Sequence, residues 1–476
     1  MKNGNFSRSA RNYAVSVLFL LLSGCSLIPE YSRPPAPLPA SYTPDDTSET
    51  NATPNSWQQY FTDPVLQNLI SIALEQNRDL RIAVLRIEEA RAQYDIQRSE
   101  KLPTIDATAN YDRSRLIFAK GQTFDVDMYR VGIGISNFEI DFFGRIKSLS
   151  EAVLEDYLAT REAQQTAQTS LIAEVAAAYV DERALSERQL LAEKTLAARE
   201  ASYIRIKRRF DAGIDTAVDL KAAKVQVENA RANASALDRE HTRAINTLLL
   251  LIGDQSVTLP DSTAALDTLA FSPIPAGLPS DLLERRPDIR AAEHKLKAAN
   301  ANIGAARAAL FPRLQLTTNI GLVNEHFTKL LSNGINAWAF TPQIIFPIFT
   351  NKRNQANLNV SRARMEIAVA EYEKAIQNAF KEVADTLLAR EQIEQQIDAQ
   401  SNATEADHER LKLVTRRYEK GVANYLELLD AQRSLFDSEQ ALVQLRQLSL
   451  SNAINLFKAL GGEWGVVEHA VTSMGD

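Results

Sequence analysis

Gly213 is the only glycine between Gly144 and Gly253, and Gly421 is the only glycine between Gly334 and Gly461. No proline occurs between Pro103 and Pro260, and none follows Pro347. Stretches of this length without helix-breaking residues predict long helices. Glycine ends a helix in the left-handed conformation at low steric cost. The sequence therefore predicts two long helical hairpins, one that turns at Gly213 and one that turns at Gly421.

Matching segments in the two halves of the chain indicate an internal duplication. Residues 74–81 match residues 283–290 at an offset of 209, and the two glycine turns match at an offset of 208. Offsets that stay nearly constant along a chain indicate a repeated structural unit. We expect repeat 1 over 61–253 and repeat 2 over 281–462, with a linker at 254–280 between them.

In each repeat, a segment with a period of two precedes the long helical hairpin. These segments cover 104–143 and 312–349, where apolar and polar residues alternate. Such alternation is typical of transmembrane β-strands, whose apolar side chains face lipid and whose polar side chains face the lumen. A soluble hairpin with one wet face is the alternative, but two hairpins with the same pattern favour membrane strands.

Three details of these hairpins are expected from the pattern. An extracellular loop should run from Leu116 to Asp127, and the last strand should run from Trp338 to Phe349. Aromatic residues gather at membrane interfaces. We expect such a girdle to be formed by Phe138, Phe142 and Phe143.

Four amphipathic strands cannot close a barrel within one chain. Open strand edges are not tolerated in lipid, and three copies would supply the twelve strands of a closed ring. A helix over 145–210 would be about 100 Å long, which exceeds the thickness of a membrane several-fold. The expected fold is an internally duplicated α+β membrane protein, in which a trimeric 12-stranded barrel continues into a long periplasmic α-helical tunnel.

The N-terminus has the features of a bacterial lipoprotein export signal. A positive start and a short apolar core precede small residues and then Cys25, the single cysteine of the chain. We expect 1–24 to be removed as a signal peptide and Cys25 to carry covalent diacylglycerol and an N-acyl lipid. Residues 25–60 would form the lipid anchor and a proline-rich strap. An ordinary signal peptide with an incidental cysteine is the alternative. Ser26 favours delivery to the outer membrane, because aspartate would be the usual inner-membrane retention signal.

The composition argues against two other classes of protein. The formal net charge is -7, and an acidic chain binds nucleic acid poorly. The five histidines show no metal-ligand spacing, and no phosphate-binding loop, nucleophile elbow or cysteine nucleophile is present. We therefore expect no enzyme, no catalytic residues, no bound metal and no cofactor besides the lipid on Cys25.

Several motifs carry a resemblance to a known family, namely Leu22–Cys25, Phe138–Arg145, Arg285–Glu293, Ala298–Arg307 and the turn Arg416–Arg433. Through them the chain resembles the TolC family of outer-membrane efflux channels, specifically its OprM-like, NodT-type lipoprotein branch. The resemblance covers essentially the whole mature chain. It implies a homotrimer in outer-membrane lipid, with 254–280 and 463–476 at an equatorial collar. It also implies a periplasmic membrane-fusion adaptor at the helical tips and an inner-membrane pump as partners.

The resemblance places a periplasmic gate at the second helical turn. The residues that fall on gate, gate-locking or acidic-constriction places are Tyr418, Leu426, Glu427, Asp430, Arg433 and, in repeat 1, Asp219. Three residues depart from the family pattern. Glu419 stands where arginine is common, Ala423 where a polar residue is common, and Glu463 where glycine is usual. The first two departures alter the expected set of closed-state salt bridges.

Glu427 and Asp430 are three residues apart and therefore share one helical face. In three copies, six carboxylates around a narrow axis would repel anions and attract cations. The plainer alternative is that Asp430 and Arg433 form an ordinary helix-surface pair of little energetic value, with Glu427 solvated. Leu426 would be either a hydrophobic constriction or a packing residue.

These features together predict the outer-membrane channel of a tripartite efflux system, a passive exit duct for drugs or other toxic small molecules. Copper or silver export and type I protein secretion are alternatives within the channel class. A periplasm-spanning structural lipoprotein that does not conduct is the alternative outside it. That reading explains the long helices and the lipid but leaves the four alternating strands without a purpose.

Overall fold

The computed structural model describes residues 26–37, 56–117, 121–259, 266–273 and 285–462. The chain divides into two compact units. The strand-bearing unit holds the N-terminal segment up to residue 35 with 86–161 and 291–373, and the turn-bearing unit holds 36–85, 162–290 and 374–476. The predicted signal peptide, Cys25 and the C-terminal tail at 463–476 lie outside the described residues.

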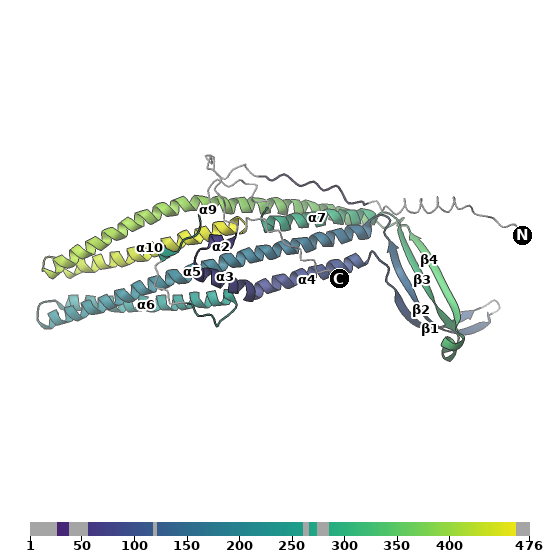
Figure 1. Cartoon of the computed structure of the whole chain (residues 1–476), viewed down its shortest axis with the longest axis horizontal. Helices are drawn as coiled ribbons and strands as arrows, with labels where there is room; N and C mark the ends of the chain where they lie inside the picture. Colours follow the sequence, from purple (N-terminus) through teal and green to yellow (C-terminus); the bar gives the residue numbers. More distant parts are fainter. Residues whose placement is uncertain (1–25, 38–55, 118–120, 260–265, 274–284, 463–476) are drawn as a thin grey trace. The chain divides into compact units, whose positions relative to one another are not determined.

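Two helices of equal length dominate the chain (Figure 1). Helix α5 spans Arg145–Asp211 and helix α9 spans Arg353–Glu419, each with 67 residues. Their return partners are α6, Ala217–Ile252, and α10, Tyr425–Ala459. Because neither long helix contains an internal proline, each keeps its hydrogen-bond ladder over its whole length. The two predicted helical hairpins are therefore present, and each belongs to one half of the duplication.

Shorter helices occupy the start of each half. They are α2 at Trp57–Tyr60, α3 at Pro64–Gln76, α4 at Arg78–Ser99 and α7 at Pro287–Ala308. Asp63 caps α3, because its carboxylate accepts from the amides of Val65 and Leu66. Asn77 is extended and separates α3 from α4, while its side chain donates to the carbonyl of Leu251.

The turn-bearing unit has an aromatic core beside α2. Tyr60 stacks on Phe457, with ring centroids 5.1 Å apart, and Phe61 packs edge-on against Phe271. Phe61 and Phe271 also form an isolated antiparallel bridge, and the short 3-10 helix η2 at Leu266–Thr268 precedes it. This is the described part of the predicted linker at 254–280.

A buried arginine joins the start of α7 to two other helices of the same unit. The guanidinium of Arg286 donates to Asp288 at 2.7 Å, to Glu382 of α9 at 3.0 Å and to the carbonyl of Ala459 in α10. Its side chain is 8% exposed. These charge-assisted bonds satisfy a charge that would otherwise be costly to bury.

The strand-bearing unit contains one antiparallel sheet in the order β1-β2-β3-β4. The strands are β1 at Asp106–Ile117, β2 at Thr123–Ile140, β3 at Arg313–Asn324 and β4 at Ile335–Ile345. The short helices η4 at Phe327–Lys329 and α8 at Leu330–Asn333 connect β3 to β4. The second strand of repeat 1 pairs with the first strand of repeat 2, so the two halves share one sheet.

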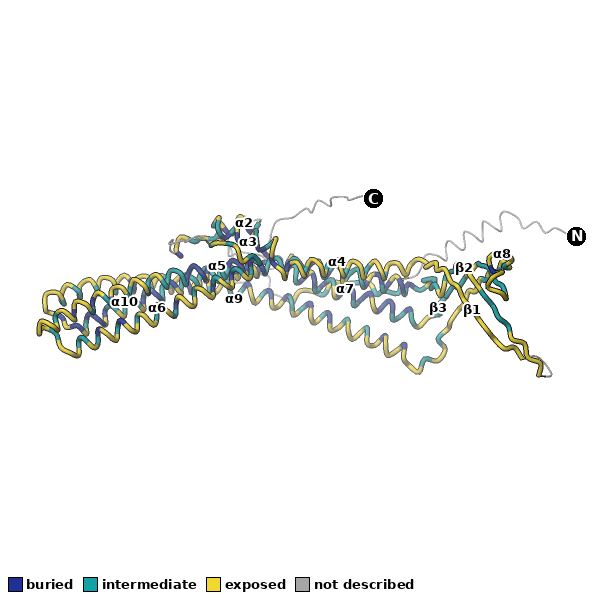
Figure 2. Tube along the Cα trace, turned by 90° about the horizontal axis from the view of Figure 1, so that it is seen from below, coloured by how far each residue is buried: buried dark blue, intermediate teal, exposed yellow. Residues whose placement is uncertain are grey.

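The register of the sheet separates an apolar face from a polar face. Ile133 pairs with Ile320, which pairs in turn with Trp338, and directly opposite residues point to the same side. The large apolar side chains exposed on this face are Val131, Ile133, Ile320, Trp338, Phe340 and Ile344. Figure 2 shows β1 exposed along its length. The alternation predicted from the sequence is therefore present, with an uncovered apolar face.

Glycines on the polar face bring two strands unusually close. Gly132 of β2 pairs with Gly321 of β3. A Cβ on Gly132 would lie 2.6 Å from the carbonyl oxygen of Ile320. Only residues without a side chain permit this approach, which is typical of sheets that bend sharply.

A β-bulge in β2 keeps its apolar residues on one face. The register with β3 shifts between Ile135 and Phe138, and Asn137 adopts a left-handed φ of 54°. The bulge adds one residue to β2, which reverses the alternation. Phe138 consequently stays on the same face as Ile135.

Two sequence-based expectations about the hairpins were wrong in detail. The pairing of β1 with β2 continues to Ile117 and Thr123, so the loop is much shorter than the predicted 116–127. The ladder extends because Arg115 pairs with Asp125 at 2.6 Å across the strands. Strand β4 occupies 335–345 rather than 338–349. Phe143 stacks on Phe311 at 4.7 Å, and the aromatic girdle of Phe138, Phe142 and Phe143 stays a prediction.

The described part of the N-terminal segment, 26–37, packs on α7 within the strand-bearing unit. Tyr31 and Arg33 both donate to the carboxylate of Glu293. Asn300 donates to the carbonyl of Pro29, and Gly304 leaves room for Ile28. These contacts place part of the predicted 25–60 strap against a helix.

Candidate functional site

The four long helical arms pack together near the two glycine turns. Ile206 of α5, Ala223 of α6 and three residues of α10 form one buried cluster. The α10 residues in it are Tyr425, Leu428 and Leu429. This cluster holds the end of the first hairpin against the end of the second, within the turn-bearing unit.

Both turns use the same backbone geometry. Gly213 has a φ of 75° and Gly421 a φ of 76°. The amide of Ile214 donates to the carbonyl of Arg209, and the amide of Val422 donates to the carbonyl of Arg417. Bonds of this kind satisfy the last carbonyls of a helix that ends in a left-handed glycine. The prediction that both glycines end long helices is confirmed.

The side chains at the two turns differ at one decisive place. In the first turn, Arg209 pairs with Asp215 at 2.9 Å. The residue equivalent to Asp215 in the second turn is Ala423, which offers no carboxylate. Arg417, the equivalent of Arg209, instead reaches Glu427 at 3.6 Å. The departure at Ala423 thus frees an arginine for one of the predicted gate carboxylates.

The caps of the return helices reinforce this difference. Asp219 accepts from the amide and the hydroxyl of Thr216, which completes a capping box at the start of α6. Glu427 holds the equivalent place in α10, where Asn424 accepts from its amide. No reciprocal bond from the cap engages the Glu427 carboxylate, which therefore turns toward Arg417.

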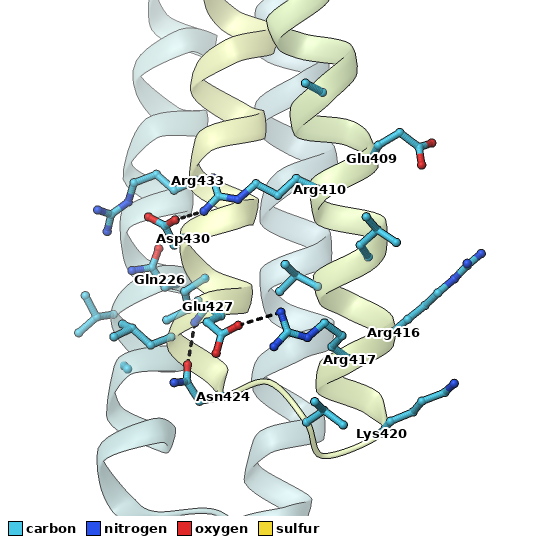
Figure 3. A pocket seen from close by; sticks show the side chains of 18 residues that line it. Gln226, Glu409, Arg410, Arg416, Arg417, Lys420, Asn424, Glu427, Asp430 and Arg433 are labelled. Carbon is cyan, nitrogen blue, oxygen red and sulfur yellow. Dashed lines mark hydrogen bonds and ion pairs between the residues drawn. The ribbon is translucent and has the colours of Figure 1, made fainter.

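A groove of about 1440 Å³ lies along α6, α9 and α10 beside the second turn (Figure 3). Asp430 on its α10 wall pairs with Arg410 on α9, and Arg410 also donates to the hydroxyl of Ser434. Four of the predicted gate residues line this groove, namely Leu426, Glu427, Asp430 and Arg433.

The groove is lined by both apolar and charged side chains. Its charged lining residues are Arg410, Arg416, Arg417, Lys420 and Arg433, with Glu409, Glu427 and Asp430 as the acids. Cations therefore outnumber carboxylates within one copy of the chain. Both pairs are exposed, since the Asp430 side chain is 61% exposed and that of Glu427 is 43%. Exposed pairs contribute roughly 0–1 kcal/mol each, so their main effect is on the local field.

The structure places the predicted gate residues in different surroundings. Leu426 is 72% exposed and carries apolar surface into the groove. Tyr418 instead packs against the buried cluster, where the Arg209 guanidinium lies 5.7 Å from its ring centroid. Burial and the nearby charge of Asp215 raise the pKa of the Tyr418 hydroxyl. Asp219 stays in its capping box at the first turn and does not line the groove.

Asp430 and Arg433 do not form the helix-surface pair considered as the plainer alternative. Asp430 turns to Arg410 on the neighbouring arm, while Arg433 extends away from Arg410 toward α6, the helix that carries Gln226 (Figure 3). Sequence reasoning assigned no role to Arg410 or Arg417. The sequence did contain a signal for these two ion pairs. Each arginine precedes Gly421 by about as many residues as its carboxylate partner follows it.

Two further findings concern the described residues alone. None of the His, Cys, Asp and Glu side chains described there gather in threes at a spacing that would hold a metal ion. Within the same residues, no α-helix combines the length and the apolar composition that crossing a membrane requires.

Comparison with known proteins identifies the family. The family model described as "Outer membrane efflux protein" matches residues 69–254 and 278–462. The chain belongs to the outer membrane efflux protein family. The two matched segments correspond closely to the two predicted repeats. Members of this family are transport components rather than enzymes, in agreement with the predicted class.

Named relatives of this family match nearly the whole chain. The probable efflux pump outer membrane protein TtgC of Pseudomonas putida is 42% identical over 460 residues, which covers 95% of each protein. The outer membrane protein OprJ of Pseudomonas aeruginosa is 41% identical over 464 residues, which covers 95% of this chain and 96% of OprJ. The resemblance to TolC-type, OprM-like channels is confirmed.

A solved structure shares the fold. The outer membrane channel MtrE of Neisseria gonorrhoeae, determined in an open state, superimposes with a TM-score of 0.83 at 40% identity. The match covers 93% of this chain and 99% of MtrE. Long helices with a small antiparallel sheet are therefore the architecture of an outer-membrane efflux channel.

Proposed function

We propose that three copies of this chain form the passive exit duct of a tripartite efflux system in the bacterial outer membrane. An inner-membrane pump and a periplasmic adaptor would deliver the cargo, and the adaptor would contact the helical tips. The observation that carries this proposal is the four-stranded sheet with one uncovered apolar face. In the same chain it is joined to two helical hairpins, each with one arm of 67 residues.

The sheet supports assembly through its open edges. Strands β1 and β4 are the two outer strands of the four, and each pairs with a single neighbour among the described strands. In lipid, unpaired backbone groups at such edges cost several kcal/mol each. Pairing β1 of one copy with β4 of the next would remove the edges, and the glycine-rich polar face would line the bend inside the ring.

The second turn supports a gate. Glu427, Asp430 and Leu426 share the wall of one groove, with charges that the α9 arginines partly balance. Around a three-fold axis these side chains would set both the width and the field of the entrance. Arg433 would act on the entrance from the groove, and Tyr418 would act on it from the buried cluster.

Organic solvents and antibiotics are the proposed cargo class. Relatives that are 42% identical include a toluene efflux pump outer membrane protein and an antibiotic efflux pump outer membrane protein, both from Pseudomonas putida. A duct selects little by itself, so the pump partner would decide the cargo.

Cargo export is tested in a bacterial strain that lacks its own efflux channels. The chain would be expressed with a matching adaptor and pump, and accumulation of a hydrophobic fluorescent dye would be followed. We expect lower accumulation only when all three components are present. Equal accumulation with and without the chain, at equal outer-membrane abundance, would reject the exit-duct role.

We also propose that the mature chain begins at a lipidated Cys25. The support is the sequence motif, together with the packing of residues 27–33 on α7 directly after it. Intact-mass measurement of the purified protein should show loss of 1–24 and the added mass of three acyl chains. A Cys25→Ala variant should lack that added mass. An unmodified cysteine in the wild-type protein would overturn the proposal.

A further inference from the structure

A second cavity, of about 250 Å³, lies among α5, α6 and α10 and shares Gln226 and Arg433 with the groove. Its polar lining consists of Thr195, Arg199, Gln226, Asn229, Asn233 and Arg433. These are two guanidinium groups, three amides and one hydroxyl, all of which donate hydrogen bonds. None of the described residues that line the cavity is an aspartate or a glutamate.

Arg199 is the unusual member of this set. It is 6% exposed, and its guanidinium donates a hydrogen bond to a neutral partner, the amide oxygen of Gln432 on α10. Burial lowers the pKa of Arg199, and the positive charge of Arg433 lowers it further. Arginine nevertheless stays charged in proteins. The cavity therefore encloses a buried positive charge without a carboxylate to balance it.

Arg433 brings a second positive charge to the same cavity. Its side chain extends toward α6 rather than toward Asp430, as Figure 3 shows. Among the described residues, neither Arg199 nor Arg433 forms an ion pair with a carboxylate. Two like charges that face one cavity repel each other, and burying an unbalanced charge is costly.

We propose that this cavity is a binding site for a small oxyanion, held by the guanidinium groups of Arg199 and Arg433. Guanidinium groups bind carboxylate and phosphate oxygens through paired, charge-assisted hydrogen bonds. Asn229, Asn233 and Thr195 supply further donors. The volume suits an inorganic phosphate or a short organic acid and excludes a drug-sized ligand. The proposal concerns binding alone and does not rest on the exit-duct function.

Occupation of this site has a structural consequence. The bound anion bridges α5 of the first hairpin to α10 of the second, one turn of helix away from Asp430. It also holds Arg433 on the α6 side, so that Asp430 remains paired with Arg410. The site thus links the charge state of the groove to the packing of the two hairpins.

The test is isothermal titration of the purified full-length protein in a non-ionic detergent. Inorganic phosphate and acetate are the two probes, added at constant ionic strength against sodium chloride. We expect saturable binding at one site per chain. Tighter binding of phosphate identifies a phosphate-type ligand, and tighter binding of acetate identifies a carboxylate. Multivalent anions also stabilise proteins without binding at a specific site. Only a heat of anion binding that saturates is therefore evidence for the proposed site.

Two variants and one control test whether the anion binds in this cavity. Arg433→Gln changes an exposed side chain and should fold normally, whereas Arg199→Lys retains a buried charge but loses the planar fork. Loss of one charged hydrogen-bond partner weakens binding by about tenfold or more. Arg416→Gln, an exposed arginine that lines only the larger groove, should bind as the wild type does. Equal affinity in all four proteins, or no saturable binding by the wild type, would overturn the site.

Discussion

Arg417 and Glu427 face each other across the second helical turn, with 3.6 Å between a guanidinium nitrogen and a carboxylate oxygen. The equivalent arginine in the first turn is held by Asp215, and Ala423 leaves that place without a carboxylate. One substitution between the repeats therefore decides whether the arginine stays inside its turn or neutralises a gate residue. The duplication provides an internal comparison for testing this.

The variant Ala423→Asp should return Arg417 to its turn and release Glu427. Both places are enclosed, with Asp215 11% and Ala423 7% exposed, so an introduced carboxylate would need the arginine as its partner. Cation preference in planar bilayers should rise by a factor of about two, the value of one exposed pair.

The effect of the introduced carboxylate on cation preference must be distinguished from the effect of releasing Glu427. The same substitution in a Glu427→Ala background provides that control, because the freed carboxylate is then missing. We expect most of the gain in cation preference to disappear in this background. An equal gain in both backgrounds would show that Arg417 does not control Glu427.

Removal of both gate carboxylates, Glu427→Ala with Asp430→Ala, should lower cation selectivity. The arginines Arg410 and Arg417 would then face the groove unbalanced. Reversal potentials under a salt gradient measure the change. Glu409→Ala is the matched control, since Glu409 lines the same groove but pairs with Lys412 on its own helix at 3.1 Å. An unchanged reversal potential in the double variant would rule out the acidic constriction.

The three helix-ending glycines should differ in their tolerance of alanine. A Cβ at Gly213 or Gly421 would meet nothing within 4 Å, so Gly421→Ala carries only the left-handed strain of roughly 1–2 kcal/mol. A Cβ at Gly253 would lie 2.6 Å from the carbonyl oxygen of Gln76. Gly253→Ala should therefore lower the thermal unfolding midpoint clearly more than Gly421→Ala. The reverse order would contradict the turn geometry.

Tyr60 should make stability fall at alkaline pH. Its hydroxyl donates to the carbonyl of Ala453 at 2.8 Å, and burial raises its pKa above the usual value near 10. A raised pKa means that the folded state keeps the proton while the unfolded state loses it. The stabilising contribution is therefore complete below about pH 10 and is lost as the pH rises further.

Tyr60→Phe isolates that contribution. At pH 8 the variant should be less stable than the wild type by roughly 1 kcal/mol, the value of a hydrogen bond. Between pH 8 and pH 11 the difference in the free energy of unfolding should shrink. Chemical denaturation at several pH values measures it, and a difference that stays constant would mean that Tyr60 does not titrate on unfolding.

Much of the fold could be predicted because helix breakers are so rare in this chain. Gly213 and Gly421 end helices at the expected places, Gly253 ends α6, and Asp63 with Pro64 starts α3. These signals are local, since a left-handed glycine or a capping carboxylate acts within one turn. The alternation of the strands was equally readable, because a period of two needs no knowledge of the partner strand.

Features that depend on a partner segment could not be predicted from the sequence. The bulge at Asn137 reverses the alternation of β2, and only the register with β3 shows it. A loop was expected between Leu116 and Asp127, yet Arg115 and Asp125 extend the ladder as a cross-strand pair. The partners of Glu427 and Asp430 lie on α9, so their pairing follows from how the arms align about Gly421.

The conductance of the purified full-length protein in planar lipid bilayers tests the central claim most directly. An exit duct should give discrete, long-lived current steps that are absent with heat-denatured protein. A structural lipoprotein with the same helices would insert without any current. Repeated absence of steps, with insertion verified by labelled protein, would contradict a channel.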